Sequence, residues 1–174
     1  MCSPRPESAT GCARRTDNAT PFAATIMMQI REFLSPDDVL VDVRASDKDS
    51  LLHDLATLAA KTAGFDAGVV TREIDKREQL GSTGVGGGIA IPHARIAGVA
   101  KPVGVLAKLR RPIDFAAIDG SPVDLVFLLL LPAAAPGGEL TALAAVARKL
   151  RDTATAARLR GAADRDEMYR VMTG

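Results

Sequence analysis

The sequence predicts an α/β fold in a single domain, with a mixed β-sheet flanked by helices. Three observations lead to this prediction. The 174 residues are enough for one well-buried core and too few for two. Segments with a helical hydrophobic period alternate along the chain with short apolar runs of strand character. No internal repeat or heptad pattern interrupts this alternation, so helices covering a sheet are the economical arrangement.

The first predicted elements are a strand and a helix. Leu40–Val43 is a short β-like run. Ser46, with Asp49 three residues later, forms a capping pattern for a helix that stops at Gly64. His53 falls on the polar face of this helix and is expected to be solvated. The opposite face is predicted to bury Leu51, Leu52, Leu55, Ala56, Leu58 and Ala59.

A second helix is predicted in "GVVTREIDKREQL", ending at Gly81. Val69, Val70, Ile74 and Arg77 are spaced along it at helical intervals. The glycine-rich stretch "GSTGVGGGIAIPHAR" starts where this helix stops.

The second half of the chain predicts three strands followed by three helices. The strands are Val103–Leu109, Ile113–Phe115 and Val123–Leu131, the last apolar enough to be central in a sheet. The last two are joined around Asp119-Gly120. A helix starts at Gly138, with an inward stripe of Leu140, Leu143, Val146, Ala147 and Leu150. Asp152 and Asp164 are predicted to cap two short helices, Thr153–Arg160 and Arg165–Met172.

Composition excludes several classes of function. The 22 Lys and Arg residues against 21 Asp and Glu give a net charge of +1, which provides no long-range field for nucleic acid or an anionic membrane. The longest apolar run, Val123–Ala135, is broken by Asp124 and Pro132 and is too short to span a bilayer. We therefore expect a soluble, cytoplasmic protein without membrane insertion.

The N-terminal stretch differs from the rest of the chain. Residues 1–28 are rich in Ser, Thr, Ala, Pro and Arg, lack a signal-peptide core and end at Met27-Met28. We interpret them as a disordered tail or a mis-assigned start, with a targeting or regulatory arm as the alternative, and place the domain at 29–174. Both cysteines, Cys2 and Cys12, fall in this stretch, so a disulfide-built fold is not expected.

The glycine-rich stretch fits neither common nucleotide motif. A Walker loop needs Gly-Lys-Ser/Thr after its spacer, but Gly88 is followed by Ile89 and no lysine appears before Lys101. The dinucleotide fingerprint needs a third glycine or alanine opening a helix, whereas the residues after Gly86 lead into the strand-like "IAIPH". Neither motif explains why the stretch leads to a histidine.

We interpret the stretch as a loop and a short strand that delivers His93 at its end, stiffened by Pro92. A neutral imidazole can attack a phosphoryl group near pH 7. The phosphorylated ring would need hydrogen-bond donors, which the N–H groups of the loop and nearby arginines can supply. The predicted phosphoryl-binding set is Gly84, Gly86, Gly87 and Arg95, with Arg77 just before the loop. The alternative is a packing histidine in a plain connector. No metal-ligand cluster or Ser/His/Asp set competes, so neither metal nor cofactor is expected.

These residues also resemble a known family. "KREQLGSTGVGGGIAIPHARI" and "PVDLVFLLLLP" are similar to the signature of fructose/mannitol-type enzyme IIA domains of the bacterial phosphoenolpyruvate-dependent phosphotransferase system. The end of the chain, "LTALAAVARKLRDTATAARLRGAADRDEMYRVM", resembles the nitrogen-regulatory branch of that family. The resemblance extends from about Ile30 to Gly174.

The resemblance implies a phosphotransferase that takes a phosphoryl group from an HPr-type phosphohistidine carrier. By position, His93 corresponds to the phosphorylated histidine and Arg77 to an arginine that neutralises the phosphoryl group. It further implies that the phosphorylation state governs binding to potassium-transport proteins and sensor kinases. A sugar-specific enzyme IIA for fructose or mannitol is one alternative, and a regulatory binding module with impaired transfer is another.

One position departs from the family pattern. Family members commonly carry a second histidine near the start of the helix that begins "GGELTAL", and Glu139 occupies that position here. We therefore treat Glu139 as a second-site residue. A carboxylate there would orient the imidazole of His93 but would repel a phosphoryl dianion, which puts the transfer rate in question.

Overall fold

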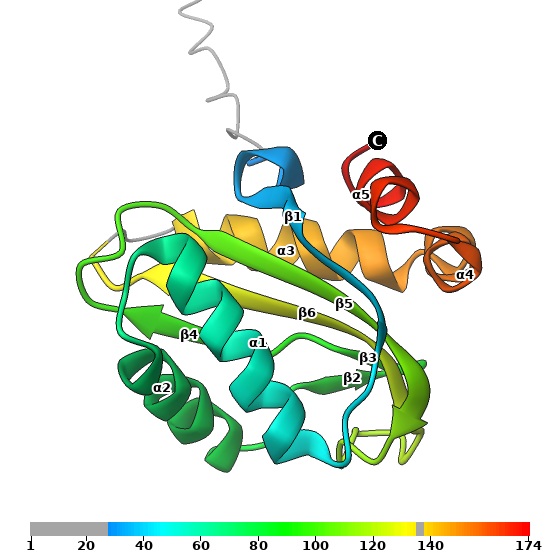
Figure 1. Ribbon diagram of the computed structural model, residues 1–174, viewed down its shortest axis with the longest axis horizontal. Helices are drawn as coiled ribbons and strands as arrows, with labels where there is room; N and C mark the ends of the chain where they lie inside the picture. The colour runs from blue at the N-terminus through cyan, green and yellow to red at the C-terminus, as the bar shows by residue number, and fades with distance from the viewer. Residues whose placement is uncertain (1–27, 135–137) are drawn as a thin grey trace, which may run out of the picture.

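The computed structural model describes residues 28–134 and 138–174, without the side chains of residues 138 and 139. Figure 1 shows a sheet with helices on both sides. In chain order the elements are η1 (Ile30–Glu32), β1 (Leu34–Val43), α1 (Lys48–Ala63), α2 (Ala67–Gln79), β2 (Gly84–Gly86), β3 (Ile89–Ala90), β4 (His93–Ile96), β5 (Val103–Ile113), β6 (Val123–Pro132), α3 (Gly138–Arg151), α4 (Thr153–Gly161) and α5 (Arg165–Thr173). The predicted α/β fold is confirmed.

The sheet is mixed, as predicted, and β6 lies at its centre. The strand order is β1-β5-β6-β3-β2, and β4 also pairs with β6 beyond β3. β5 runs antiparallel to β6, whereas β3 and β4 run parallel to it, one after the other along the same edge. A strand with neighbours on both edges and helices on both faces needs apolar side chains on both sides, which explains the run "VDLVFLLLLP".

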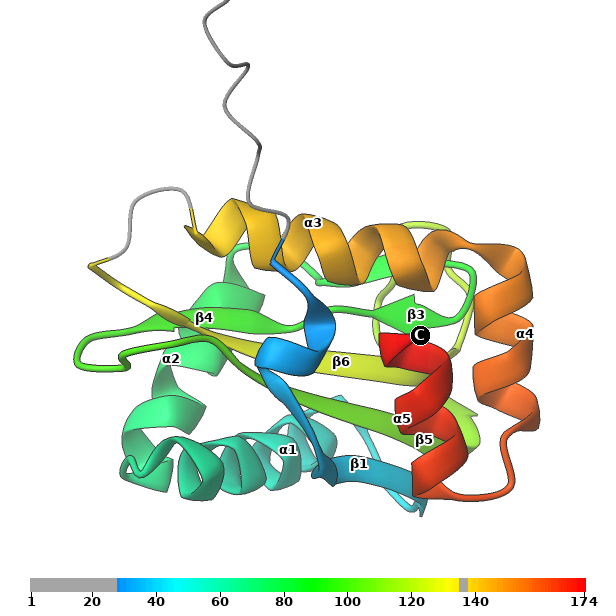
Figure 2. The same cartoon turned by 90° about the horizontal axis from the view of Figure 1, so that it is seen from above.

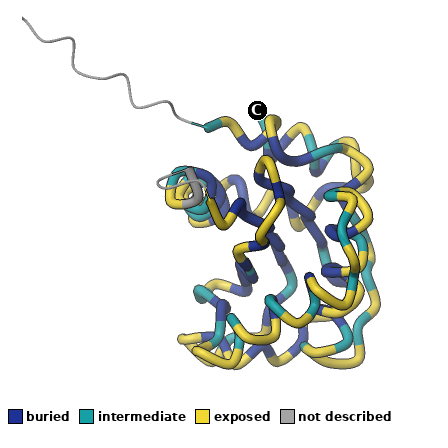
Figure 3. Tube along the Cα trace, turned by 90° about the vertical axis from the view of Figure 1, so that its left-hand side faces the viewer, coloured by how far each residue is buried: buried dark blue, intermediate teal, exposed yellow. Residues whose placement is uncertain are grey.

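Two hydrophobic layers enclose the sheet, and the side chains of β6 alternate between them. Val126, Leu128 and Leu130 pack with α1 and α2 on one face. On the other face, residues such as Phe127 and Leu129 pack with η1, α3, α4 and α5. Figure 2 shows α3 running along the sheet with α4 and α5 at one end, and Figure 3 shows the buried residues gathered between the layers.

Helix ends follow the predicted chemistry, with one correction. The N-cap of α1 is Asp47, not Ser46, because the Asp47 carboxylate accepts a hydrogen bond from the Ser50 N–H at 2.8 Å. The Ser46 hydroxyl instead donates to Asp47. Gly64 ends α1 in the left-handed conformation, at φ 74°. The Asp152 and Asp164 caps of α4 and α5 are confirmed.

Two strand boundaries differ from the prediction. β1 begins at Leu34 instead of Leu40, because its N-terminal part also pairs with β5. The predicted strands Val103–Leu109 and Ile113–Phe115 are not two strands: β5 continues past Leu109 through polar residues and ends at Ile113, which leaves Phe115 outside it. Local hydrophobicity assigns the residues before Ile113 to a loop. They are part of β5 because the strand stays paired with β6 as far as Ile113, which lies opposite Val123.

Leu140, which was predicted to face the core, is exposed, and so is Val69, one of the periodically spaced residues of the second helix. Leu140 is 71% exposed, because the buried stripe of α3 is Ala142, Val146 and Leu150 and a residue two positions before Ala142 lies on the opposite side of the helix. Val69 is 38% exposed for a similar reason, since the buried pair of α2 is formed by the next residue, Val70, and Ile74. His53 is exposed on α1, as predicted.

Residues 1–27 lie outside the described part of the chain, as do both cysteines, so the predictions for the N-terminal stretch stay predictions. Among the helices in the described ranges, none has the length and apolar character that crossing a bilayer requires.

Candidate functional site

The position of His93 is fixed by the pairing of β4 with β6. The prediction that a short strand ends at His93 is wrong: β3 stops at Ala90, and His93 is the first residue of β4, paired with Leu129. Between the two strands the backbone stays anchored, because the Leu129 N–H donates to the carbonyl of Pro92 at 2.9 Å. Pro92 has no N–H of its own, which fits the break in pairing at that point.

Two hydrogen bonds orient the imidazole of His93. Nδ1 lies 2.9 Å from the carbonyl oxygen of Ile91, and the Nε of Arg77 donates to Nε2 at 3.3 Å. A carbonyl can only accept and a guanidinium can only donate, so these partners assign the proton to Nδ1 and a lone pair to Nε2. Nε2 is therefore the nucleophilic nitrogen of the ring.

Arg77 reaches this nitrogen from the last turn of α2. Its NH1 group also donates to the carbonyl of Gly81 at 3.0 Å, so the guanidinium bridges the loop after α2 and the histidine. Arg95 lies two residues after His93 on β4 and thus on the same side of the strand. The structure places Arg77 in contact with His93 and Arg95 near enough for its charge to act on the ring. Their roles toward a phosphoryl group stay predictions.

The surroundings of the ring favour its neutral form. Burial is the largest cause that lowers the pKa of His93, and the positive charges of Arg77 and Arg95 lower it further. The hydrogen bond to Ile91 and the charge of Glu78 raise it, but by less. The pKa of His93 therefore lies below the ordinary value of 6.5, and the ring is neutral near pH 7.

We expect the nucleophilic form of His93 to persist to lower pH than that of an unperturbed histidine. Because its pKa is lowered, the ring stays neutral as the pH falls through the ordinary value and gains a proton only below it. The measurement is an NMR titration of the His93 ring in the unmodified protein, compared with a histidine in an unstructured peptide. A midpoint above that of the peptide would contradict the expectation.

The glycines predicted to bind a phosphoryl group form a hairpin in which the N–H groups of Gly84 and Gly87 already have partners. The N–H of Gly84 donates to the Ser82 hydroxyl at 3.1 Å, and that of Gly87 donates to the Asp119 carboxylate at 2.9 Å. Gly86, Gly87 and Gly88 all have positive φ, which the turn between β2 and β3 requires. The hairpin and His93 lie at different points along β6, since Ile89 pairs with Leu125 and His93 with Leu129. A phosphoryl-binding role for Gly84, Gly86 and Gly87 stays a prediction.

Arg160 of α4 holds the tip of this hairpin. Its NH2 group donates to the carbonyl of Gly87 at 2.7 Å, while its guanidinium pairs with both carboxylate oxygens of Asp124 at 2.7 and 2.8 Å. A Cβ at Gly88 would lie 2.6 Å from the Arg160 side chain and 2.9 Å from Asp124. The third glycine therefore leaves room for this ion pair.

Gly84 is required by packing, and we expect Gly84→Ala to destabilise the fold. An added Cβ would lie 2.7 Å from the Cβ and 2.8 Å from the Cα of Ala117, whose backbone cannot yield cheaply. The expected loss is about 1–3 kcal/mol of unfolding free energy, measured by urea denaturation. Gly161→Ala is the control, because a Cβ there meets nothing within 4 Å. Equal stability of the two variants would contradict this account.

Glu139 lies in the first turn of α3, and its side chain is outside the described part of the structure. Its predicted influence on His93 stays a prediction. In the ranges 28–134 and 138–174, His, Cys, Asp and Glu side chains form no group of three or more that could hold a metal ion.

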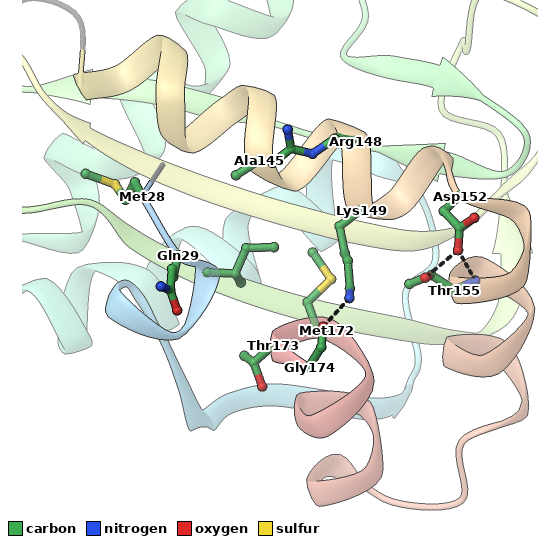
Figure 4. Close-up of a pocket in the computed structure, with 11 residues that line it drawn as sticks. Met28, Gln29, Ala145, Arg148, Lys149, Asp152, Thr155, Met172, Thr173 and Gly174 are labelled. Atoms are coloured by element: carbon green, nitrogen blue, oxygen red, sulfur yellow. Dashed lines mark hydrogen bonds between the residues drawn. The ribbon is translucent and has the colours of Figure 1, made fainter. Parts of the chain in front are cut away.

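A hollow of about 400 Å³ lies apart from these residues, between η1, α3 and the end of α5 (Figure 4). Lys149 Nζ donates to the backbone oxygen of Gly174 at 2.6 Å within it, and Asp152 caps α4 through Thr155 at its edge. Neither His93 nor Arg77 lines this hollow. Its polar groups stabilise the C-terminal helices.

Sequence reasoning missed three polar residues that the fold places behind the histidine. Glu78 follows Arg77 in the chain but contacts Thr83, and Lys48 of α1 pairs with Glu78. A glutamate near a helix end is ordinarily solvated, so its residue type carried no signal. Its place beside Arg77 in the family-like segment was the one available hint.

Fold and site together define a mixed α/β protein that holds a neutral histidine with its free nitrogen facing a guanidinium. Over residues 32–174 the sequence matches the family described as "Phosphoenolpyruvate-dependent sugar phosphotransferase system, EIIA 2". The chain belongs to this family, as its sequence motifs predicted.

Individual relatives agree with the nitrogen-regulatory branch. A "Nitrogen regulatory protein" of Bradyrhizobium diazoefficiens is 42% identical over 145 residues, which cover 83% of this chain and 95% of that protein. A protein of the same name from Pseudomonas aeruginosa is 39% identical over 147 residues, or 84% of this chain and 96% of that one. The crystal structure of nitrogen regulatory protein IIA-Ntr from Neisseria meningitidis has a TM-score of 0.78 at 33% identity and covers 82% of this chain and 97% of its own. The predicted branch is confirmed.

Proposed function

We propose that this chain is a phosphotransferase that accepts a phosphoryl group on Nε2 of His93 from an HPr-type phosphohistidine carrier. The observation that carries the proposal is the pair of hydrogen bonds on the imidazole, which leaves the Nε2 lone pair beside Arg77. Membership of the enzyme IIA family supports it, because this family serves a phosphoenolpyruvate-dependent phosphotransferase system.

The transfer needs no additional reactant. Arg77 first gives up its hydrogen bond to Nε2, and the released lone pair attacks the phosphorus atom. The bond between phosphorus and the carrier's histidine nitrogen breaks, so that its electron pair returns to the carrier's ring. The Nδ1 proton of His93 stays in its hydrogen bond to the carbonyl of Ile91. Arg77 then faces the transferred group, and its charge offsets the developing negative charge on the phosphoryl oxygens.

Leu80 is an exposed apolar side chain close to the candidate site. It is 86% exposed and follows Arg77 by three residues at the end of α2. Because Arg77 contacts His93, a protein carrier that delivers a phosphoryl group to His93 would come close to Leu80. We therefore place Leu80 within the proposed docking surface for the carrier.

The proposed role of the phosphoryl group is regulation in the cytoplasm. The relatives named nitrogen regulatory proteins match over more than four-fifths of this chain, which favours a regulatory domain over a sugar-specific one. In this role the unmodified and phosphorylated forms bind partners differently, with potassium-transport proteins and sensor kinases as the proposed targets. A phosphoryl dianion beside Arg77 changes the local charge enough to create or block such a contact.

The direct test incubates the protein with phosphoenolpyruvate, enzyme I and an HPr-type carrier. Mass spectrometry should show a phosphoryl increment that is lost on brief acid treatment, as expected for phosphohistidine. The regulatory half of the proposal is tested by comparing proteins captured by the phosphorylated and unmodified forms. The absence of an increment with every such carrier would refute the transferase proposal, and identical capture by both forms would refute the regulatory one.

A further inference from the structure

Glu78 is a carboxylate held almost fully out of solvent directly behind the candidate site. Its side chain is 8% exposed and belongs to the last turn of α2, next to Arg77. Oε1 accepts the N–H of Thr83 at 2.9 Å and pairs with Lys48 Nζ at 2.7 Å, while Oε2 accepts the Thr83 hydroxyl at 2.7 Å. A buried carboxylate with this many partners occupies a defined position and does not move as a surface side chain does.

These contacts continue as a chain of hydrogen bonds that ends on the histidine. Glu78 accepts the N–H of Thr83, the carbonyl of Thr83 accepts the N–H of Ile91 at 3.0 Å, and the carbonyl of Ile91 accepts Nδ1–H of His93 at 2.9 Å. Every donor points in the same direction, from the ring toward the carboxylate. The links run through the Cα atoms of Ile91 and Thr83, so they fix the position of the carbonyl that accepts Nδ1–H, while the charge of Glu78 acts on the ring across space.

We propose that Glu78 is a positioning residue for His93: through Thr83 and Ile91 it holds the imidazole in the Nδ1–H tautomer and keeps Nε2 directed at Arg77. The same residue fixes Arg77 itself, because Glu78 ties the last turn of α2 to Thr83 and to α1. An effect of Glu78 on the rate of phosphoryl transfer rests on the proposed function. An effect of Glu78 on the tautomer of His93 can be measured in the unmodified protein and does not.

Lys48 keeps Glu78 ionised behind the histidine. Its Nζ pairs with Glu78, lies 3.4 Å from the carbonyl of Phe115 and sits 4.8 Å from the centre of the Phe115 ring. Burial raises the pKa of Glu78, but hydrogen bonds from Lys48 and Thr83 outweigh it, so that the pKa lies below its ordinary value and the group is ionised near neutral pH. The lysine thus keeps the carboxylate charged, and it is the charged carboxylate that acts on His93.

The charged groups that act on the ring set the sign of the test. Arg77 and Arg95 lower the pKa of His93, and Glu78 raises it. Removing the Glu78 charge in Glu78→Gln should therefore lower the pKa of His93. The double variant Glu78→Gln, Lys48→Met should lower it as well, because it removes the same charge and leaves no unpaired lysine behind. A residue that only stabilises the fold would leave the pKa unchanged.

The experiment is NMR of the unmodified protein with ¹⁵N-labelled histidine, which reports both the tautomer and the pKa of His93. Wild type should show the Nδ1–H form, and Glu78→Gln should show a growing share of the Nε2–H form. Glu73→Gln is the matched control: Glu73 is on the same helix and pairs with Lys76 at 2.7 Å, and none of its hydrogen bonds belongs to the chain that leads to His93. Circular dichroism verifies that each variant is folded.

Phosphorylation kinetics supply the second readout. We expect Glu78→Gln to lower kcat/KM for transfer from the carrier roughly tenfold, as a misplaced reacting group does, with no change in Glu73→Gln. A wild-type protein that no carrier phosphorylates would refute the proposed function and leave the NMR result standing. The positioning role is overturned if folded Glu78→Gln keeps the tautomer and pKa of the control. If that variant does not fold, the double variant Glu78→Gln, Lys48→Met takes its place, and a His93 pKa equal to that of the control overturns the positioning role.

Discussion

Replacing His93 with alanine is expected to abolish phosphoryl labelling of the protein altogether. Nε2 of His93 is the ring nitrogen that carries no proton, and its lone pair accepts a hydrogen bond from the guanidinium of Arg77. The chain has only one other histidine, His53, which is exposed on α1. Intact-protein mass spectrometry after incubation with the phosphorylated carrier gives the readout, with circular dichroism to show that the variant is folded.

His53→Ala is the matched control for this experiment and should label as wild type does. Acid-labile labelling of His93→Ala at the wild-type level would place the acceptor elsewhere and contradict the site. Loss of labelling in both variants would point to damage to the carrier's docking surface, which a binding measurement with the unphosphorylated carrier would then reveal.

Arg77→Gln is expected to slow phosphorylation by roughly 10²- to 10³-fold, the usual cost of removing one preorganised donor from a developing anion. The guanidinium donates to Nε2 and lies where negative charge accumulates during transfer. The melting temperature should change little, since the other hydrogen bond described for this side chain is to the carbonyl of Gly81 at the end of the same helix. Stopped reactions with the labelled carrier measure the rate, and thermal unfolding followed by circular dichroism measures stability.

Arg72→Gln provides the comparison for this variant, because Arg72 is an exposed arginine on the same helix. It should leave the transfer rate unchanged. A large loss of stability in Arg77→Gln together with normal transfer would show that the arginine serves the fold, as an arginine at a helix end ordinarily does.

Local patterns predicted the elements whose physics is local. Asp152 and Asp164 mark helix starts because a side-chain oxygen accepts an N–H three residues later, a contact that the sequence spacing alone specifies. The apolar run of β6 predicted a central strand for a similar reason, since burial on both faces favours apolar residues on both sides of the strand, as from Leu125 to Leu131. The exposure of Leu140 and Val69 was not predicted, because a helical wheel does not show which part of an apolar stripe contacts the sheet.

Some residues of the candidate site could be predicted from the sequence and others could not. His93 and Arg77 were visible in the sequence because the glycine-rich stretch and its flanks match the motif of a family. Glu78, Thr83 and Lys48 were not, because charged and hydroxyl side chains in those positions are ordinarily solvated. Their role depends on contacts across the fold, such as Lys48 with Glu78, which are thirty residues apart in the chain.

By itself the sequence determined the family, the alternation of helices with strands, and the histidine and arginine at the centre of the site, because each is written in adjacent or periodically spaced residues. Only the tertiary structure decided which imidazole nitrogen is free and which carboxylate lies behind it. It also decided that the N–H of Gly87 faces Asp119 and its carbonyl faces Arg160. A hydrogen-bond partner depends on which distant segments the folded core brings within about 3 Å, and that distance is a property of the packed chain.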